Sequence, residues 1–326
     1  MRRAISGAEL GDDVFAEDPS VNRLQEIAAE TMGKEAGLLV SSGTQGNLIA
    51  MLSHCQRGDE VICGDQAHTL LYEAGGAWAV GGFGLRTVRN DSRGRLDAGE
   101  LRATIRPDDD HFPTTGLICL ENTHNRCGGA VLSEEDLSSV HDVAEQHGIP
   151  IHIDGARIFN AAVALGVPAA RLAEYSDSIT FCLSKGLAAP VGSVLCGGRD
   201  FIKRARRARK VLGGGMRQAG VIAAAGIYAL ENMVDRLAID HENAQLAAAG
   251  LAEIPAIELT PAPQTNLVYF TVAGWDAERI VSALEEKGVL CFDEGGRIRW
   301  VTRFGIERED VEEALLRLGA IFRDGA

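Results

Sequence analysis

Apolar and polar positions divide the chain into two regions with different patterns. Between about residue 22 and about residue 230, short apolar runs alternate with stretches in which apolar residues recur every three or four positions. The runs predict strands and the periodic stretches predict helices. We expect strands at 59–64, 115–122, 149–154 and 178–183. We expect helices at 19–33, 133–148 and 219–230. The alternation predicts an α/β fold, with a mostly parallel sheet that helices cover on both faces.

The pattern changes after about residue 231. The ranges 237–254, 276–288 and 308–322 have helical spacing, whereas 265–272 and 297–305 alternate like half-exposed strands. This mixture predicts a smaller α+β domain. We therefore divide the chain into an N-terminal segment (1–21), a large domain (22–230) and a small domain (231–326).

Composition narrows the classes of partner. The chain has 326 residues, 46% of them hydrophobic, and a formal net charge of −14. A field of this sign disfavours nucleic acid and anionic membranes as partners. The basic run KRARRARK at 203–210 is the exception. We interpret it as the solvated face of a helix, rather than as a localisation signal or a patch for a phosphate backbone.

Several missing signals favour a cytoplasmic location. The start, MRRAISGAELGDD, has no apolar stretch of the signal-peptide type, and the apolar range 219–230 is too short to span a bilayer. Seven scattered cysteines without a CxxC pair are typical of reduced thiols. The eight histidines include no HxxxH or HExxH pair, so we expect no metal site.

Ionisable residues stand at the end of one predicted strand and directly after another. Asp154 ends the run IPIHID, and Arg157 comes three residues later. Ser184 and Lys185 follow the strand at 178–183. Ligands of an open parallel sheet bind outside the carboxyl ends of its strands, so these side chains are candidates for a site. Taken singly, Asp154 could equally cap a helix, and Lys185 could pair with a buried acid.

A helix start and two histidines add to these candidates. In SSGTQGNL, Gly43 and Thr44 precede an apolar helical run, and the free N–H groups at a helix start bind phosphate. No GKS or GKT follows as in a P-loop, and no GxGxxG opens a helix as in nicotinamide enzymes. His124, in LENTHN, could also belong to a turn network, and His68 could be a solvated histidine.

Together these residues fit pyridoxal phosphate. This cofactor needs a helix start for its phosphate, an aspartate to hold a proton on its pyridine nitrogen, and a lysine to form a Schiff base with its aldehyde. Thr44, Asp154 and Lys185 stand at suitable places for these three tasks, and a histidine can stack over the ring. The sequence therefore predicts pyridoxal 5'-phosphate as cofactor.

Seven blocks in order along the chain resemble the low-specificity L-threonine aldolases. They are GDDVFAEDPSVNRLQ, SSGTQGNL, AHTLLYEAGG, LENTHN, HIDGARIFNAA, CLSKGLAAPVGS and GGGMRQAG. These aldolases are fold-type-I pyridoxal-phosphate enzymes of the β-eliminating lyase group, and the resemblance runs from about residue 11 to the C-terminus. It implies retro-aldol cleavage of L-threonine, L-allo-threonine and related β-hydroxy-α-amino acids to glycine and an aldehyde. Such an enzyme would serve threonine catabolism and glycine biosynthesis.

The resemblance also implies which residues hold the cofactor. Lys185 would be the Schiff-base lysine, Asp154 would pair with the pyridine nitrogen, and His68 would stack on the ring. The phosphate would be held by Gly43, Thr44 and Ser184, with Arg217 reaching a phosphate across a subunit interface. The implied assembly is a homotetramer, built as a dimer of dimers with its active sites at subunit interfaces.

For the substrate, the resemblance implies three contacts. Arg157 would lie by the ring's phenolic oxygen and the substrate carboxylate, and His124 would approach the β-hydroxyl. The segment RWVTR at 299–303 resembles an Arg-x-Val-Thr-His segment of the family, so Arg299 would bind the carboxylate. Lys185, His68 and His124 would then be the catalytic residues. Arg303 stands where the family usually has histidine, so we expect a different contact there.

The start of the chain is a second departure from the family. Relatives usually begin with an RSDTVT-type segment whose serine and threonine approach the active site. This chain begins MRRAISGAELGDD, and its Ser6 does not match that motif. Either a longer start is missing or these contacts are lost, and both would affect activity and stability.

Two other functions stay open. The chain could be another fold-type-I pyridoxal-phosphate lyase that carries out β-elimination on cysteine-like or tyrosine-like substrates. It could also be an inactive homologue that binds the cofactor. The pair His68 and His124 favours a β-hydroxy substrate and therefore the aldolase.

Overall fold

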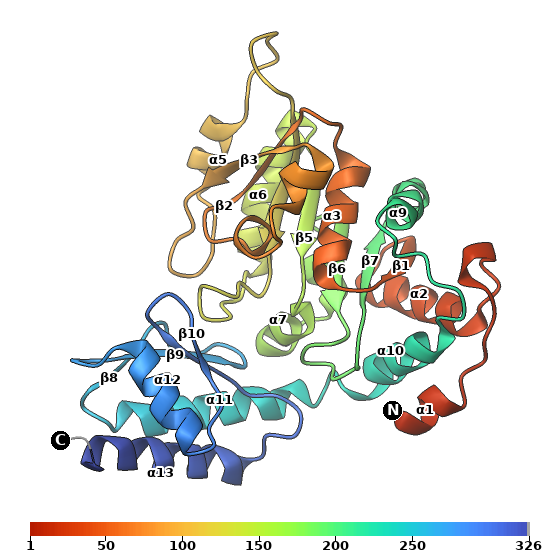
Figure 1. The fold of residues 1–326 in the computed structure, drawn as a ribbon. Helices are drawn as coiled ribbons and strands as arrows, with labels where there is room; N and C mark the ends of the chain where they lie inside the picture. The colour runs from red at the N-terminus through yellow and green to blue at the C-terminus, as the bar shows by residue number, and fades with distance from the viewer. Residues whose placement is uncertain (325–326) are drawn as a thin grey trace.

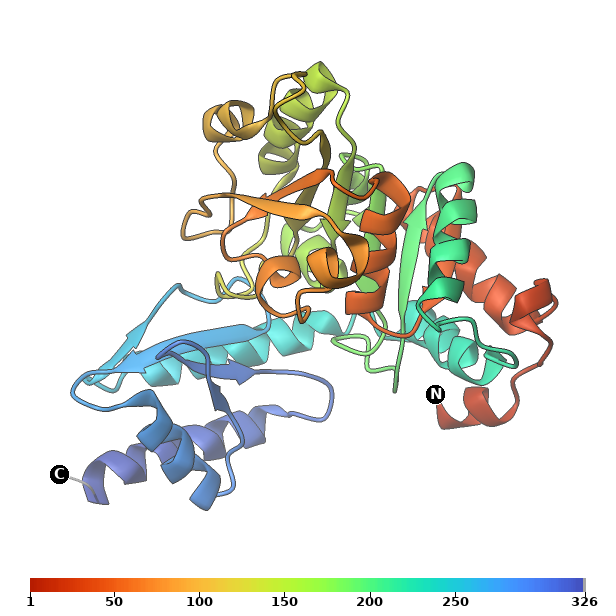
Figure 2. The same ribbon diagram turned by 45° about the horizontal axis from the view of Figure 1, so that its top comes forward.

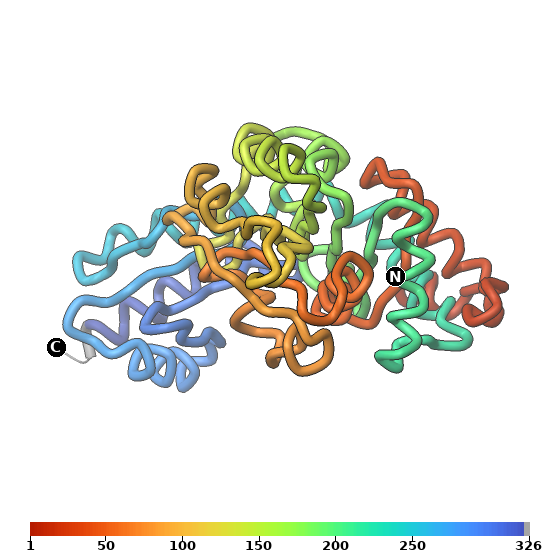
Figure 3. The backbone as a smooth tube through the Cα atoms, turned by 90° about the horizontal axis from the view of Figure 1, so that it is seen from above, coloured from red at the N-terminus to blue at the C-terminus, as the bar shows by residue number. Residues whose placement is uncertain are grey.

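The computed structural model describes residues 1–324 and consists of a large and a small sheet with their helices (Figure 1). The small domain lies at one end of an elongated molecule and the N-terminal helices lie at the other (Figure 3). The chain passes between the two parts after residue 232, where α10 ends. The domain boundary at residue 230 stays a prediction.

The large sheet has seven strands in the order β1-β7-β6-β5-β4-β2-β3. They are β1 (Ala36–Val40), β2 (Glu60–Gly64), β3 (Gly84–Val88), β4 (Thr115–Glu121), β5 (Ile151–Asp154), β6 (Ser178–Cys182) and β7 (Ser193–Gly197). Strand β7 runs antiparallel to both of its neighbours, and the other pairs are parallel. The prediction of a mostly parallel sheet is confirmed.

Helices cover both faces of this sheet. They are α2 (Pro19–Met32), α3 (Gly43–His54), α5 (Ala98–Thr104), α6 (Glu134–His147), α7 (Ile158–Leu165), α8 (Ala169–Ala173), α9 (Arg199–Val211) and α10 (Gly220–Asn232). Shorter pieces are α1 (Arg2–Ser6), a 3-10 turn at Asp13–Phe15, α4 (His68–Leu71) and a π turn at Ala77–Gly81. Successive side chains of a strand face opposite sides. Leu39 accordingly packs with α2 and α10, whereas Leu38 and Val40 pack with α3 and α9.

Local signals explain where the first long helix begins and ends. The Asp18 side chain caps α2 by accepting a hydrogen bond from the backbone N–H of Val21, at 3.0 Å. The Ser20 hydroxyl does not cap this helix and donates instead to the carbonyl of Glu9 at 2.7 Å. Gly33 ends the helix with a φ of +63°, in the left-handed region that glycine adopts without strain.

The small domain has a four-stranded antiparallel sheet in the order β10-β11-β9-β8. Its elements are α11 (Leu237–Ala252), β8 (Ile257–Leu259), β9 (Leu267–Val272), α12 (Ala277–Glu286), β10 (Phe292–Asp293), β11 (Ile298–Val301) and α13 (Arg308–Asp324). Figure 2 shows α11 running along this sheet toward the large domain. We expected half-exposed strands here, and this was wrong. In β9 and in β11, every residue except one is buried. Helices cover one face of the sheet, and part of its second face lies against the large domain.

The basic run at 203–210 lies on α9, and most of its side chains face solvent as predicted. Arg209 is an exception, with 2% of its surface exposed. Its Nη2 lies 2.6 Å from Asp13 Oδ2, and its Nη1 donates to the carbonyl of Leu39 at 2.7 Å. The prediction of a wholly solvated face was therefore wrong at this residue. In residues 1–324, every helix is too short or too polar to cross a membrane.

Candidate active site

The residues at the predicted strand ends meet at one edge of the large sheet. β4 and β5 are parallel neighbours, and their last residues, Glu121 and Asp154, lie side by side in register. Lys185 follows the end of β6 after a two-residue step. The first turn of α3 packs against the same strand end, since a Cβ added to Gly43 would lie 3.0 Å from Cys182 Sγ. The candidates thus share one site.

Asp154 is the most deeply buried acid of the site, with 3% of its surface exposed. Its Oδ2 accepts a hydrogen bond from Asn47 Nδ2 at 2.9 Å. Its Oδ1 has no hydrogen-bond partner in the described part of the chain. Burial, followed by the charge of Glu121, raises the pKa of Asp154, while His68 and Lys185 act in the opposite direction. An unpartnered buried oxygen of this kind calls for a donor from a ligand.

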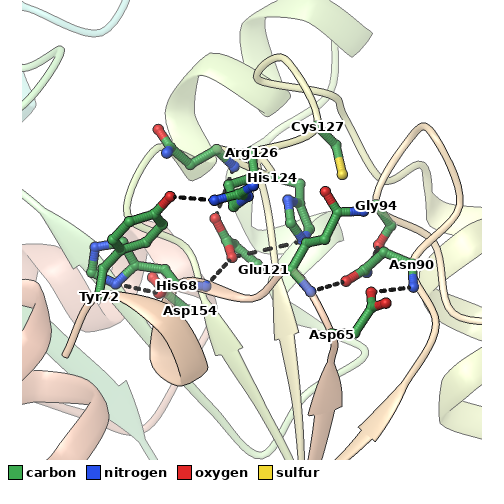
Figure 4. A network of polar contacts seen from close by, with 12 residues as sticks. Asp65, His68, Tyr72, Asn90, Gly94, Glu121, His124, Arg126, Cys127 and Asp154 are labelled. Atoms are coloured by element: carbon green, nitrogen blue, oxygen red, sulfur yellow. Dashed lines mark hydrogen bonds and ion pairs between the residues drawn. The ribbon is translucent and has the colours of Figure 1, made fainter. Parts of the chain in front are cut away.

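His68 stands beside Asp154 at the start of α4 (Figure 4). Its backbone N–H donates to Glu121 Oε2 at 2.7 Å, and its ring Nδ1 lies 3.0 Å from Glu73 Oε1 and 3.9 Å from Asp154 Oδ2. Burial alone would lower the pKa of His68, but the hydrogen bond to Glu73 and the nearby carboxylates outweigh it, so the pKa is raised. The ligand atoms of His68, Glu73 and Asp154 lie within 4.8 Å of one another, which a cation could bridge. Asn47 already donates one amide hydrogen to each carboxylate, and this holds the cluster together.

Lys185 is half-buried, in a turn between the exposed Ser184 and the buried Gly186. Its ammonium group makes no hydrogen bond within the described residues, although its charge reaches Asp154. A lysine held at the edge of the core without a polar partner leaves its amine available to a ligand.

The start of α3 forms the opposite side of the site. Ser42 caps the helix by accepting from the backbone N–H of Gln45 at 3.1 Å. Gly43 and Thr44 are the first two helical residues, so their N–H groups have no carbonyl of the helix to bond to. These groups and the helix dipole favour an anion at this point.

Two arginines converge on one amide oxygen. Arg299 Nη2 donates to Asn125 Oδ1 at 2.9 Å, and Arg157 Nη1 lies 3.5 Å from the same atom. Burial and then the charge of Arg299 lower the pKa of Arg157. The two arginines share this neutral acceptor, and the one carboxylate paired with Arg299 is Glu294, whose Oε2 is 3.5 Å from Arg299 Nε. The excess positive charge suits a second carboxylate from a ligand.

Glu294 ties the small domain to the large one at this place. It belongs to the turn between β10 and β11, and its carboxylate accepts hydrogen bonds from the hydroxyls of Tyr72 and Tyr269 and from Asn125 Nδ2. Arg126 Nη1 also contacts the Tyr72 hydroxyl, at 2.7 Å (Figure 4). These contacts fix the position of Arg299, which the small domain contributes, relative to the strand ends of the large domain.

His124 lies at the inner wall of the site, with 1% of its surface exposed. Its Nε2 is 3.8 Å from Glu121 Oε2, and neither ring nitrogen has a hydrogen-bond partner among the described residues (Figure 4). The ring packs against Gly94, where a Cβ would come within 2.6 Å of it. Its approach to a substrate hydroxyl stays a prediction.

Arg217 and Arg303 contact none of the other site residues in the described structure. Arg217 is exposed, pairs with Asp12 Oδ2 at 2.7 Å and lies over the Phe15 ring. A role for it across a subunit interface stays a prediction. Arg303 is exposed too, and its Nη1 donates to the carbonyl of Phe304 at 3.0 Å.

Comparison with known proteins identifies the family. Residues 1–273 match the family described as "Beta-eliminating lyase". The chain belongs to this family. It is 46% identical over 330 residues to the probable low-specificity L-threonine aldolase 2 of Arabidopsis thaliana, covering 99% of this chain and 93% of that protein. It is 45% identical over 313 residues to the low specificity L-threonine aldolase of Escherichia coli K12, covering 96% of this chain and 92% of that protein.

Solved structures of related proteins have the same fold. A putative L-allo-threonine aldolase from Listeria monocytogenes superposes with a TM-score of 0.83 at 17% identity, covering 98% of this chain and 92% of that one. The threonine aldolase of Leishmania major superposes with a TM-score of 0.83 at 19% identity, covering 98% and 94%. The α/β fold with its small C-terminal domain is thereby confirmed. Beta-eliminating lyases generally depend on pyridoxal phosphate.

Sequence reasoning missed three polar residues that this lyase places in the site. Asn47 and Glu73 lie inside the blocks SSGTQGNL and AHTLLYEAGG, but nothing in their spacing indicates that they contact Asp154. Glu294 lies outside every block, in the turn DEGGR. One signal could have indicated Asn47. It stands one turn after the predicted phosphate-binding helix start, and a polar side chain on the buried face of that helix must point toward the strand ends.

Proposed function

We propose that the chain is a low-specificity L-threonine aldolase that uses pyridoxal 5'-phosphate to split L-threonine and L-allo-threonine into glycine and acetaldehyde. The identity of about 45% to such aldolases over nearly the whole chain supports the reaction. The main observation that supports pyridoxal phosphate as the cofactor is the unpartnered Oδ1 of buried Asp154. The same site also holds the amine of Lys185, which makes no hydrogen bond in the described structure.

The residues present fit this cofactor. Asp154 Oδ1 would accept a hydrogen bond from the protonated ring nitrogen, and Lys185 would bind the aldehyde carbon. The start of α3, at Gly43 and Thr44, would hold the phosphate together with Ser184, and His68 would cover the ring. When bound, the cofactor supplies an electron sink for the bond that breaks at Cα.

The two arginines orient the amino acid. Arg157 and Arg299 would take the carboxylate in place of Asn125 Oδ1, which they now share. A carboxylate fixed at two guanidinium groups would limit rotation of the substrate and so orient the bond that breaks. Glu294 holds Arg299 in place for this task.

A base must take the proton of the β-hydroxyl as the aldehyde leaves. His124 supports this role because both of its ring nitrogens lack a partner. His68 is the second candidate, either directly or through a water that it shares with His124. Its Nδ1 is held by Glu73, so its Nε2 is the nitrogen that would face the ligand.

Product analysis of the purified protein with added cofactor tests the proposal. L-threonine should give glycine and acetaldehyde in equal amounts, and the protein should absorb near the visible edge. Lys185→Ala should abolish both, whereas Lys203→Ala, on the exposed face of α9, should change neither. Pyruvate and ammonia as products would instead mean β-elimination, and colour without turnover would mean an inactive homologue. L-allo-threonine, L-serine and L-phenylserine then define the substrate range.

We also infer a homotetramer with active sites at subunit interfaces. Arg217 supports it, because this arginine is exposed and lies over the ring of Phe15, which is itself exposed. Lys185→Ala and Arg217→Ala proteins, each inactive, should regain activity when their subunits are exchanged, since one hybrid site then carries both wild-type residues. If subunit exchange is demonstrated but the hybrids recover no activity, Arg217 has no role across the interface.

A further inference from the structure

A continuous chain of hydrogen bonds runs beneath the site and ends at Asp154. His54 Nε2 lies 2.8 Å from Ser178 Oγ, and His152 Nδ1 lies 2.9 Å from the same hydroxyl. His152 Nε2 is 3.1 Å from Asn47 Oδ1, and Asn47 Nδ2 donates to Asp154 Oδ2 at 2.9 Å. None of the proposed steps uses the first four residues of this chain.

Three elements of secondary structure build this chain in the interior. His54 and Asn47 lie seven residues, or about two turns, apart on α3, on the face toward the sheet. His152 of β5 and Ser178 of β6 are paired in register. Ser178 and His152 are fully buried, and Asn47 has 1% of its surface exposed. Buried polar groups in such a position have to satisfy one another.

Asn47 has a single acceptable orientation. Its Nδ2 is 2.8 Å from Glu73 Oε1 as well as 2.9 Å from Asp154 Oδ2, so its two amide hydrogens go to two carboxylates. The reversed amide would bring its oxygen against both carboxylates, where no hydrogen is available. The amide oxygen therefore faces His152 Nε2, and that nitrogen must carry a hydrogen.

The remaining protons follow from this one. Burial lowers the pKa of His152 to about 3 and that of His54 to about 4, so both rings are neutral at pH 7. With its hydrogen on Nε2, His152 accepts at Nδ1, and Ser178 must donate there. The Ser178 oxygen then accepts from His54 Nε2–H. Every hydrogen bond of the chain thus points from His54 toward Asp154 and Glu73.

We propose that Asn47 is a positioning residue for the cofactor, and that His152, backed by Ser178 and His54, locks its amide so that Asp154 Oδ1 stays free and unprotonated for the ring nitrogen. This inference rests on the proposed function. Without the lock, Asn47 can turn, and two carboxylates would share a buried site without a common donor. One of them would then bind a proton. A protonated Asp154 cannot hold a proton on the ring.

A matched pair of variants tests whether cofactor binding depends on the N–H donor of His152 or only on the space that its ring fills. His152→Leu removes the donor to Asn47, whereas His152→Gln keeps an N–H close to the position of Nε2. Titration of cofactor into the apoprotein should show affinity weakened by about tenfold or more for His152→Leu, because a hydrogen bond that supports a charged group contributes that much. His152→Gln should stay within about threefold of wild type on the same grounds. His147→Leu, at an exposed position of α6, should match wild type.

Kinetics and nuclear magnetic resonance give readouts that a merely structural role would not move. In His152→Leu, kcat for L-threonine should fall with KM unchanged, because Arg157 and Arg299 are not touched. In the wild-type apoprotein, ¹⁵N-labelled His152 should show the neutral tautomer with hydrogen on Nε2. Ser178→Ala should shift this tautomer equilibrium and weaken cofactor affinity, and it replaces His152→Leu if that variant does not fold.

The inference is overturned if His152→Leu binds cofactor as wild type does, or if His152→Gln is as weak as His152→Leu. A ¹⁵N spectrum with hydrogen on Nδ1 of His152, or with a charged ring at pH 7, also overturns it. If the wild-type protein fails to bind pyridoxal phosphate at all, the proposed function fails, and the tautomer of His152 still decides the inference about Asn47.

Discussion

Replacing Arg209 by methionine should destabilise the protein strongly, although Arg209 lies in a run of basic residues. Methionine keeps the unbranched stem of the side chain but leaves Asp13, with 1% of its surface exposed, without its partner at 2.6 Å. Breaking one side of a buried ion pair costs about 3–5 kcal/mol. Arg206, at 3.4 Å from Asp13 Oδ1, compensates in part, while the carbonyl of Leu39 loses a donor. We expect a loss of about 3 kcal/mol.

Urea unfolding followed by circular dichroism measures this change. The protein concentration must be the same for all variants, since assembly contributes to apparent stability. Arg207→Met makes the same chemical change at an exposed position of α9 and should stay within about 0.5 kcal/mol of wild type. Asp13→Asn combined with Arg209→Met should cost less than the sum of the two single changes, by about 1 kcal/mol or more. A loss below about 0.5 kcal/mol for Arg209→Met would refute the reasoning.

Three further predictions concern the site and the core. Asp154→Asn keeps the shape of the side chain without its charge, so cofactor affinity in an absorbance titration should fall about tenfold or more. Turnover near that of the wild type would exclude a role for Asp154 in keeping the ring protonated. Arg299→Gln should raise KM for L-threonine about tenfold, while exposed Arg303→Gln should change it less than about twofold, and equal effects would contradict the carboxylate assignment. Burial raises the pKa of the Cys55 and Cys63 thiols to about 12, so a thiol reagent at pH 8 should label them only after unfolding, and rapid labelling of the native protein would count against this burial.

The sequence predicted the elements that depend on neighbouring residues. Helix α2 was recognisable because Asp18 and Gly33 act within one turn of its ends. The strands β4, β5 and β6 were recognisable from apolar runs, and the acid and lysine after two of them pointed to the edge where they meet. The burial of β9 was not predictable in the same way, because its alternation says nothing about a second domain that covers its other face.

The sequence by itself determined the strands at 59–64, 115–122, 149–154 and 178–183 and their alternation with helices. It also determined the candidate set of Asp154, Lys185 and the start of α3, and the resemblance to the aldolases. Only the tertiary structure decided which polar groups are excluded from water together. Asn47 and Asp154 are 107 residues apart, and Asn125 and Arg299 are 174 apart, yet each pair shares a hydrogen bond. Helix caps and strand runs arise from contacts within a few residues of the chain. The partner of a buried polar group is whichever group packing brings to it, and that is a property of the whole fold.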